Sequence, residues 1–505
     1  MAYNFTKEEF ENRDKKTSYA TVLYKKINAD LITVISAYLK LLKHFDNNIF
    51  LLESNENSSN KGRFSMITLN PDKVWKCKGY ESFIAANYQQ APNDFIKQEG
   101  AALKNLRNFS ADAKINWHNL SYLNDALPAM SAGIFGYMTY DMVRLIEKLP
   151  DQKLLDEINI PDSIFIRPQI TIIFDHVFDC ALICAPLYQD RNDSFGDLTT
   201  KIEKIIDILS QPLIDDNSQN IQLDENFTSN VTKEEYCRHV VTSQNYIKAG
   251  DIFQILPSQR FKAHYPNNLH PFYFYRSLRT INPSPFLFFL NFKDFALTGS
   301  SPEIMVALKK NIVTIRPLAG TRKRGKNSQE DRAIAQELAQ DEKEIAEHLM
   351  LIDLARHDIG AVAKAGSVRV TKKMEIEYYS AVMHLSSNIE GEIKDNLNAL
   401  DALIAGFPAG TVSGAPKIRA MQIIEEIEKV RRSFYAGCVG YIASNGDMET
   451  CITLRSALIK DQQIYLHAGA GVVYDSKPDF EYQECLNKAQ ALVKAYHNIK
   501  NFKLR

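Results

Sequence analysis

The chain has 505 residues, 45% of them hydrophobic, with 60 Lys and Arg against 61 Asp and Glu. A net charge of −1 excludes the broad basic surface of a nucleic-acid-binding protein, so any anion site must be local. Apolar runs fall short of the roughly 18 residues that a membrane span needs, and the N-terminus lacks the apolar region of an export signal, so we expect a cytoplasmic protein without a membrane partner.

The first half of the chain is predicted to consist mostly of strands. Alternating apolar and polar residues indicate strands with one buried face, and β-branched runs indicate buried strands. Residues 215–230 are polar and lack a period, so we place a linker there, between domains at 1–214 and 231–505. The elements expected before the linker are a helix at 31–44, strands within 48–80, a strand or turn and a helix start at 130–150, and one or two strands at 163–187.

The second half is predicted to alternate between helices and runs of strands. A long helical stretch at 329–356 places Ile334, Leu338, Ile345, Leu349 and Ile352 on one apolar face. Strands that arrive in runs, with helices between some of them, favour an α+β fold with an antiparallel sheet. The other expected elements are a helix at 233–249, strands at 252–261, 286–292, 295–298 and 303–316, three strand-like runs at 436–443, 449–459 and 463–473, and a closing helix from Pro478.

Two pairs of acidic residues are candidates for a metal site. Glu344 and Glu347 share a helix face, and Glu481 and Glu484 share a stripe of the last helix with Lys488. Oxygen ligands without His or Cys clusters suit Mg²⁺, although such pairs can also be solvated charge stripes. The seven cysteines are scattered and include no CxxC pair, which excludes a cysteine-based zinc or iron–sulfur site.

Two glycine turns and several cations could bind an anion. The segment 410–417 (GTVSGAPK) precedes a helix start, where free N–H groups favour negative charge, and 468–471 (AGAG) ends a strand; tight turns are the simpler explanation of both. Arg455 in the strand TLRSAL needs a carboxylate partner or a ligand. His384 is the candidate for proton transfer, although a histidine in an apolar run is more often a core residue. Residues 316–324 form a basic turn that we expect to be solvated.

Together these segments resemble the chorismate-utilising enzymes, most closely the large subunits of anthranilate synthases. The resemblance covers 230–490 densely, and 48–75 and 130–150 more thinly. It is carried by an ordered set of motifs: GDIFQ, PSQRF, NPSP, GSSPE, RPLAGTR, EHLML, MHL, GTVSGAPK, AGCVGY, AGAGVV and EYQECLNKA. It implies two antiparallel β-sheets packed as a sandwich with helices outside and the substrate in a cleft.

At matching positions the resemblance implies the site residues. Glu347 and Glu484 would hold Mg²⁺, which grips the ring carboxylate of chorismate. Glu344 would protonate the departing 4-hydroxyl, and His384 would assist proton removal at C2. Thr411 completes the catalytic set, and the implied substrate contacts are Gly320, Thr321, Tyr435, Arg455, Gly469, Gly471 and Lys488.

Two positions indicate which reaction of the family to expect. Aminodeoxychorismate relatives have a nucleophilic Lys where this chain has Ala319, and isochorismate and salicylate synthases have a water-activating Lys where it has Gln254. A neutral amide cannot act as that base. The resemblance therefore implies that ammonia, supplied by a glutamine amidotransferase subunit (component II), converts chorismate to anthranilate and pyruvate. An aminodeoxychorismate synthase component and a non-catalytic binder of tryptophan or chorismate are the alternatives.

The family also binds tryptophan as a feedback inhibitor of the pathway's first committed step. The LLES and NPSP motifs are intact, but Phe286 and Leu287 replace the usual Tyr-Met pair. Leu for Met nearly conserves volume, so we expect inhibition of altered strength. The implied tryptophan site comprises Glu53, Ser54, Pro285, Phe286, Leu287, Val439, Tyr441 and Cys451.

Overall fold

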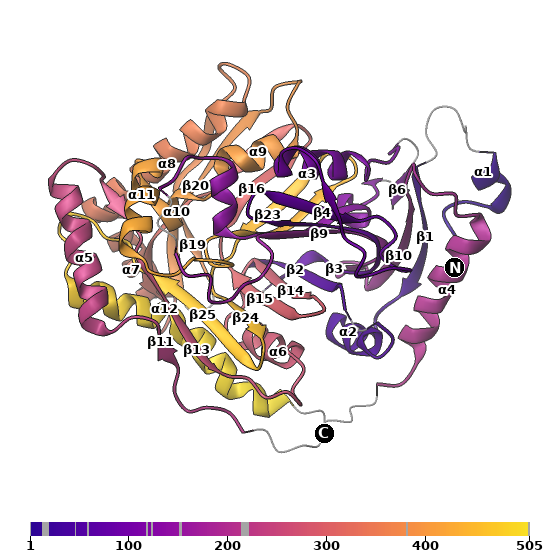
Figure 1. Cartoon of the computed structure of the whole chain (residues 1–505), viewed down its shortest axis with the longest axis horizontal. Helices are drawn as coiled ribbons and strands as arrows, with labels where there is room; N and C mark the ends of the chain where they lie inside the picture. The colour runs from indigo at the N-terminus through magenta and orange to yellow at the C-terminus, as the bar shows by residue number, and fades with distance from the viewer. Residues whose placement is uncertain are drawn as a thin grey trace.

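The computed structural model describes residues 2–12, 20–45, 47–57, 60–117, 120–122, 125–150, 154–213, 222–379 and 382–502. The fold is mixed α+β around a large antiparallel sheet (Figure 1). The expected linker lies partly outside the described residues, and its end forms β11, which pairs with β13. In the described part of the chain, no helix is long and apolar enough to cross a membrane.

The strands are named in chain order. The first half contains β1 (Thr21–Asn28), β2 (Ile49–Asn57), β3 (Asn60–Lys78), β4 (Glu81–Ala85), β5 (Ile96–Gln98), β6 (Ser121–Tyr122), β7 (Asp125–Ala126), β8 (Gly133–Met138), β9 (Ser163–Asp175), β10 (Cys180–Leu187) and β11 (Thr228–Ser229). The second half contains β12 (Gln254–Ile255), β13 (Ser258–His264), β14 (Phe286–Asn291), β15 (Phe295–Ser301), β16 (Ile304–Lys309), β17 (Ile312–Ile315), β18 (Leu318–Lys323), β19 (Arg369–Tyr378), β20 (Val382–Glu392), β21 (Gly414–Ala415), β22 (Cys438–Ala443), β23 (Met448–Ile452), β24 (Ser456–Lys460) and β25 (Gln463–Gly469).

The helices alternate with these strands. The α-helices are α1 (Lys7–Glu11), α2 (Val34–Leu42), α3 (Ala102–Ala111), α4 (Phe195–Ser210), α5 (Lys233–Lys248), α6 (Phe272–Ile281), α7 (Ser328–Gln340), α8 (Glu342–Val362), α9 (Ala399–Gly406), α10 (Gly410–Ser413), α11 (Lys417–Ile427) and α12 (Pro478–Asn498). Three 3₁₀ turns are η1 (Ala129–Ser131), η2 (Tyr140–Leu145) and η3 (Ile499–Phe502).

The strand ladder has two arms that share the long strands β3 and β9. One arm runs from β9 and β3 through β2, β14, β15, β24 and β25 to β13. The other runs from β9 through β8, β22, β23, β16 and β17 to β20. The register of β3 against β9 shifts between Pro71 and Lys73, so a bulge lies where the arms diverge. One hydrophobic cluster contains residues of both arms.

Strand β14 packs apolar side chains against a hydrophobic cluster on each of its two faces. Its run FLFFLN alternates between two clusters: Phe288 and Leu290 join the cluster that holds residues of both arms, whereas Leu287 and Phe289 face the cluster that contains residues of α2 and α4. Helix α2 presents Ala37, Tyr38 and Leu41 to that second cluster. Figure 1 shows α2 and α6 below the strands, with α8 and α9 above them.

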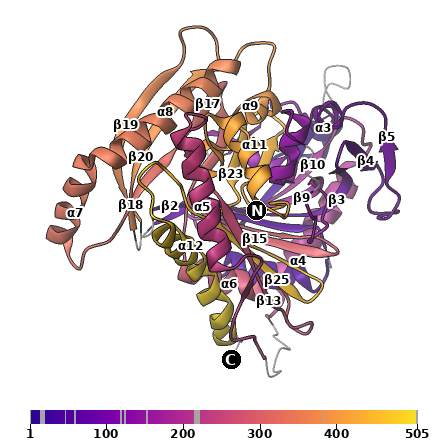
Figure 2. The ribbon, with the colours of Figure 1, turned by 60° about the vertical axis from the view of Figure 1, so that its left-hand side comes forward.

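Several details differ from the sequence-based expectations. The runs 252–261 and 303–316, each expected as one strand, are divided into β12 and β13 and into β16 and β17. The stretch 329–356 is two helices, because Asp341 adopts an extended backbone and its carboxylate caps α8 by accepting from the N–H groups of Lys343 and Glu344. Leu349 was expected in the apolar face but is exposed, and His348 is buried one position earlier against Ser387. Figure 2 shows α7 beside β18, β19 and β20 at one end of the molecule.

The run 449–459 is also divided, into β23 and β24. Between them Arg455 has a φ of 47°, so the strand is interrupted there. The structure therefore places Arg455 in a connection, where the sequence had placed it on a strand face.

Candidate active site and a second pocket

The two acids of α8 lie on one face, as predicted, but have different partners. The Nε2 of Gln254 donates to Oε1 of Glu347 at 2.5 Å. Arg322 Nη1 donates to Oε1 of Glu344 at 3.0 Å and Nη2 to Asp341 at 2.7 Å. Burial, followed by the negative charge of Glu344, raises the pKa of Glu347. The basic turn is thus paired with acids, contrary to the prediction that it is solvated, and Glu347 is an incompletely neutralised carboxylate.

His384 lies opposite Thr321 in the pairing of β18 with β20. Its Nδ1 is 3.1 Å from the Oγ1 of Thr321 and 3.1 Å from the carbonyl oxygen of Gly320. A carbonyl oxygen can only accept, so this contact favours the tautomer with hydrogen on Nδ1 and leaves Nε2 as a proton acceptor. Burial, followed by the positive charge of Arg455, lowers the pKa of His384 to about 4. A neutral imidazole is the form that a general base requires.

Gly320 must be a glycine for two reasons. Its φ is +60°, a conformation that other residues adopt only under strain. A Cβ there would lie 3.1 Å from Oε2 of Glu344 and 2.9 Å from Cδ1 of Leu338. The turn therefore brings the Thr321–His384 pair against α8.

The second glycine turn joins α12 to the same region. A Cβ at Gly471 would lie 3.2 Å from Nε2 of Gln254, and one at Gly469 would lie 3.1 Å from the hydroxyl of Tyr435. The Nζ of Lys488 donates to the carbonyl of Gly469 at 3.2 Å. Glu347, Tyr435 and Lys488 are therefore neighbours of this one turn.

Tyr435 and Arg455 have the surroundings expected of an anion site. Tyr435 is buried and stacks on His467 with ring centroids 4.3 Å apart. Burial lowers the pKa of the Arg455 guanidinium, and the Tyr435 hydroxyl acts on that pKa in the opposite direction. Within the described part of the chain, no carboxylate forms an ion pair with Arg455. A half-buried guanidinium without an acid calls for an anionic ligand.

Thr411, in α10, lies beside an acid that the motifs did not single out as functional. Thr411 and Glu303 line the same small cavity, between β16 and α8. Glu303 is 6% exposed, and the N–H of Leu318 donates to its Oε1 at 3.4 Å. Burial raises its pKa to about 8. The sequence signal was an acid directly after GSSP, but its burial and its place beside Thr411 are visible only in the structure.

The acids of α12 complete the predicted donor set. Glu484 forms an ion pair with Lys488 at 2.7 Å, and Glu481 is buried with a pKa raised mainly by that burial. Lys488 also lowers the pKa of Glu347, so α8 and α12 act on each other electrostatically. Among the described residues, no group of three or more His, Cys, Asp or Glu could hold a metal by itself.

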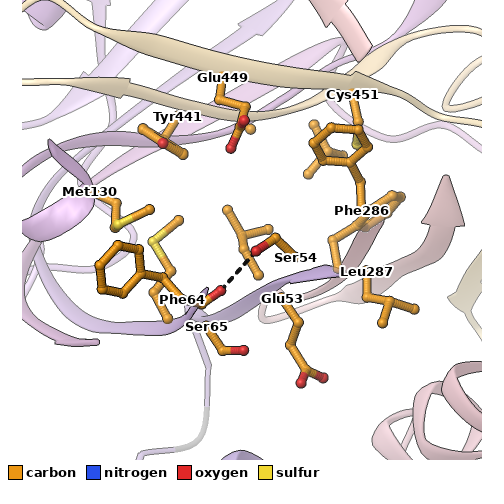
Figure 3. A pocket seen from close by; sticks show the side chains of 15 residues that line it. Glu53, Ser54, Phe64, Ser65, Met130, Phe286, Leu287, Tyr441, Glu449 and Cys451 are labelled. Carbon is orange, nitrogen blue, oxygen red and sulfur yellow. Dashed lines mark hydrogen bonds between the residues drawn. The ribbon is translucent and has the colours of Figure 1, made fainter. Parts of the chain in front are cut away.

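A second pocket contains all the predicted tryptophan-site residues except Pro285. It lies between β2 and β14 on one side and β22 and β23 on the other (Figure 3). Glu53 points away from the cavity in Figure 3 and instead accepts from Tyr275 at 2.5 Å and from Arg279 at 2.7 and 2.9 Å. Glu449 points into the cavity from β23, and burial raises its pKa. The lining residues not predicted from the sequence are Leu52, Phe64, Ser65, Met66, Met130, Phe288, Gly440 and Glu449.

Comparisons with known proteins show the family to which the chain belongs. A family model described as chorismate binding enzyme matches residues 49–494. The chain is 44% identical over 494 residues to anthranilate synthase component 1 of Cereibacter sphaeroides, covering 97% of this chain and 96% of the relative. It is 38% identical over 495 residues to the protein of the same name from Pseudomonas putida, covering 96% and 98%.

Solved structures show the same likeness. The crystal structure of anthranilate synthase component I from Streptococcus pneumoniae matches with a TM-score of 0.74 at 35% identity, covering 85% of this chain and 92% of that one. A menaquinone-specific isochorismate synthase from Escherichia coli matches with a TM-score of 0.68 at 18% identity, covering 95% of both chains, which shows a shared fold.

Proposed function

The chain belongs to the chorismate binding enzyme family, and we propose that it is the large subunit of an anthranilate synthase. In this reaction chorismate and ammonia give anthranilate, pyruvate and water. The observation that carries the proposal is the convergence of Glu347, His384, Tyr435 and Lys488 on two glycine turns. These groups supply a proton acceptor, a cation and a carboxylate for a metal beside the Arg455 guanidinium, which has no acidic partner among the described residues.

Mg²⁺ is the cofactor we propose, held by Glu347 and Glu484. The donor set fits because Glu347 is a half-buried carboxylate whose pKa is raised, so a cation would stabilise its charged form. Mg²⁺ takes few protein carboxylates and keeps positions for water and substrate oxygens, so a complete protein cage is unnecessary. When bound, it would neutralise and orient the ring carboxylate of chorismate.

Side chains of this protein bind the substrate and transfer its protons. Arg455 and the hydroxyl of Tyr435 bind the enolpyruvyl carboxylate, and Thr321 and Lys488 contact the substrate. Ammonia adds at C2, and the 4-hydroxyl leaves as water once it is protonated. His384 Nε2 accepts the proton from C2 as the bond between C3 and the enolpyruvyl oxygen breaks, which makes the ring aromatic. The released enolpyruvate takes up a proton on its methylene carbon and becomes pyruvate.

Two carboxyls compete for the role of the acid that protonates the 4-hydroxyl. Glu344, the residue that the resemblance implied, is held in an ion pair with the Arg322 guanidinium at 3.0 Å. Glu303 has a pKa of about 8 and lies beside Thr411, so it holds a proton at neutral pH. The environment of Glu303 supports assigning it as the proton donor, with Glu344 fixing Arg322 next to Gly320.

The alternative reactions lack the residues they need. Ala319 cannot form the covalent amine link of the aminodeoxychorismate route. Gln254 is a neutral amide that is hydrogen-bonded to Glu347, and an amide cannot activate water. A non-catalytic binder would not need an acid, a base and a carboxylate-binding guanidinium together.

We assign the second pocket to tryptophan as a feedback inhibitor. Phe286, Leu287 and Cys451 offer apolar contacts for an indole, and Glu449 offers a carboxylate for the amino group. The pocket walls continue into the active site. Leu287 pairs with Ser300, whose N–H donates to the carbonyl of Arg455 at 3.1 Å. Ile452, next to Cys451, donates to the carbonyl of Glu303 at 3.0 Å. Movement of either wall would displace a residue of the active site.

The ammonia source we propose is a glutamine amidotransferase partner, component II. Apolar side chains that suit a docking surface are exposed within a few residues of the site: Phe253 beside Gln254, Leu349 beside Glu347, Tyr474 beyond Gly471, and Phe480 before Glu484. We further propose that the two arms of the ladder face each other as a β-sandwich, because they share one hydrophobic cluster.

The test is incubation of the purified chain with chorismate, Mg²⁺ and ammonium at pH 8. We expect blue anthranilate fluorescence that disappears with EDTA and decreases with tryptophan. An amino-deoxy product with its enolpyruvyl group intact would support the aminodeoxychorismate alternative, and unchanged chorismate would refute catalysis.

A further inference from the structure

Arg432 and Glu428 form a buried ion pair in the connection between α11 and β22. They are 2% and 6% exposed. The Nε of Arg432 donates to Oε2 of Glu428 at 2.9 Å, and Nη2 donates to Oε1 at 2.7 Å, a two-pronged arrangement. Neither residue belongs to a motif or to the site described above, yet a buried charged pair has a substantial desolvation cost that calls for an explanation.

The guanidinium also fastens two segments of the active site. Its Nη1 donates to the carbonyl of Val412 at 2.7 Å, directly after Thr411. Its Nη2 donates to the carbonyl of Leu256 at 2.5 Å, two residues after Gln254. One side chain thus sets the distance between the Thr411 turn, which is the short helix α10, and the segment of Gln254, which contacts Glu347.

The carboxylate of Glu428 reaches a third segment through a relay. Its Oε1 accepts from both the N–H and the hydroxyl of Ser258, each at 2.9 Å. Ser258 Oγ is 2.9 Å from His467 Nε2, and because its single hydrogen goes to Glu428, it accepts from His467. The His467 ring stacks almost parallel on Tyr435, at 7° between planes. The orientation of Tyr435 is therefore tied to the same ion pair.

Resting on the proposed function, we propose that Arg432, with Glu428, is a positioning residue of the chorismate site. It holds Tyr435, the Thr411 turn and the Gln254 segment in one arrangement without touching the substrate. Lysine keeps the charge but cannot reproduce a planar fork that serves three acceptors at once.

The experiment compares Arg432→Lys with Arg167→Lys. Arg167 is a matched control: it is 1% exposed and donates to Asp72 at 2.9 and 2.6 Å, but it lies in β9, and its contacts are with residues of the N-terminal half. Both variants should lose thermal stability. We expect only Arg432→Lys to raise the KM for chorismate, at least tenfold, with the KM for ammonia within twofold of wild type.

A purely structural role would reduce the amount of folded enzyme and leave both KM values unchanged, and that result would overturn the proposal. If Arg432→Lys does not fold, Ser258→Ala cuts the relay to Tyr435 with a smaller change. It should raise the KM for chorismate at least threefold, and an unchanged KM would again refute the inference. Anthranilate production by the wild-type chain, measured first, tests the proposed function separately.

Discussion

Replacing Glu303 with Gln removes the titratable proton of the side chain and keeps its size and shape. The amide keeps an oxygen that can accept from Leu318, so the fold should be retained. The pKa of Glu303 rises from an ordinary 4.5 to about 8 through burial. Between these values the folded state keeps a proton that the unfolded chain releases, so wild-type stability is complete below pH 4.5 and is lost as the pH rises towards 8.

The magnitude follows from the same linkage. Each pH unit within that window costs about 1.4 kcal/mol, so the free energy of unfolding of the wild type should fall by about 3 kcal/mol between pH 5 and pH 7 from this group alone. Glu303→Gln should lose that part of the pH dependence and be the more stable protein at pH 7. Its turnover should fall by about 10²–10⁴-fold if Glu303 is the acid.

The assay combines urea unfolding followed by circular dichroism at both pH values with anthranilate fluorescence. Glu375→Gln, at an exposed position of β19, makes the same chemical change as a control. If Glu303→Gln showed the same pH dependence of stability as wild type, the carboxyl would not be protonated in the folded state. If it kept normal turnover, Glu303 would not be the acid.

Three further predictions address the other groups. Glu347→Gln should reduce turnover more than 100-fold without lowering the melting temperature, because the pKa of Glu347 is raised and the amide removes an unfavourable charge. A variant that keeps wild-type turnover with Mg²⁺ and still loses that turnover in EDTA would refute the metal role of Glu347. Glu449→Gln should raise the tryptophan inhibition constant at least tenfold without a comparable change in kcat, as measured by inhibition curves, and unchanged inhibition would place the amino group elsewhere. Gly320→Ala should cost about 1–3 kcal/mol of stability from its positive φ and also reduce turnover at least tenfold by crowding Glu344. Gly79→Ala has a similar φ of +58° but nothing within 4 Å, so it should share only the stability loss, and equal activity in both variants would show that the contact with Glu344 is unimportant.

Much of the fold was predictable because its signals are local. The alternation in FLFFLN follows from the pleat of a strand, and the helix at α2 follows from apolar residues at helical spacing. The break at Asp341 had a local signal too, since an Asp three residues before Glu344 is a capping pattern, but the continuous apolar periodicity concealed it. The exposure of Leu349 could not be inferred, because the face of α8 that is buried depends on where β20 packs.

The same division applies to the site. Residue order alone singled out Glu347, His384, Tyr435 and about half of the residues that line the second pocket, because the motifs that carry them are specific. Tertiary structure decided what each group can do. Glu303 holds its proton because segments far apart in the chain exclude water from it, and Arg455 calls for an anion because no acid packs against it in the described structure. Protonation and pairing depend on desolvation and on neighbours brought together by folding, and neither is a property of a residue's place in the sequence.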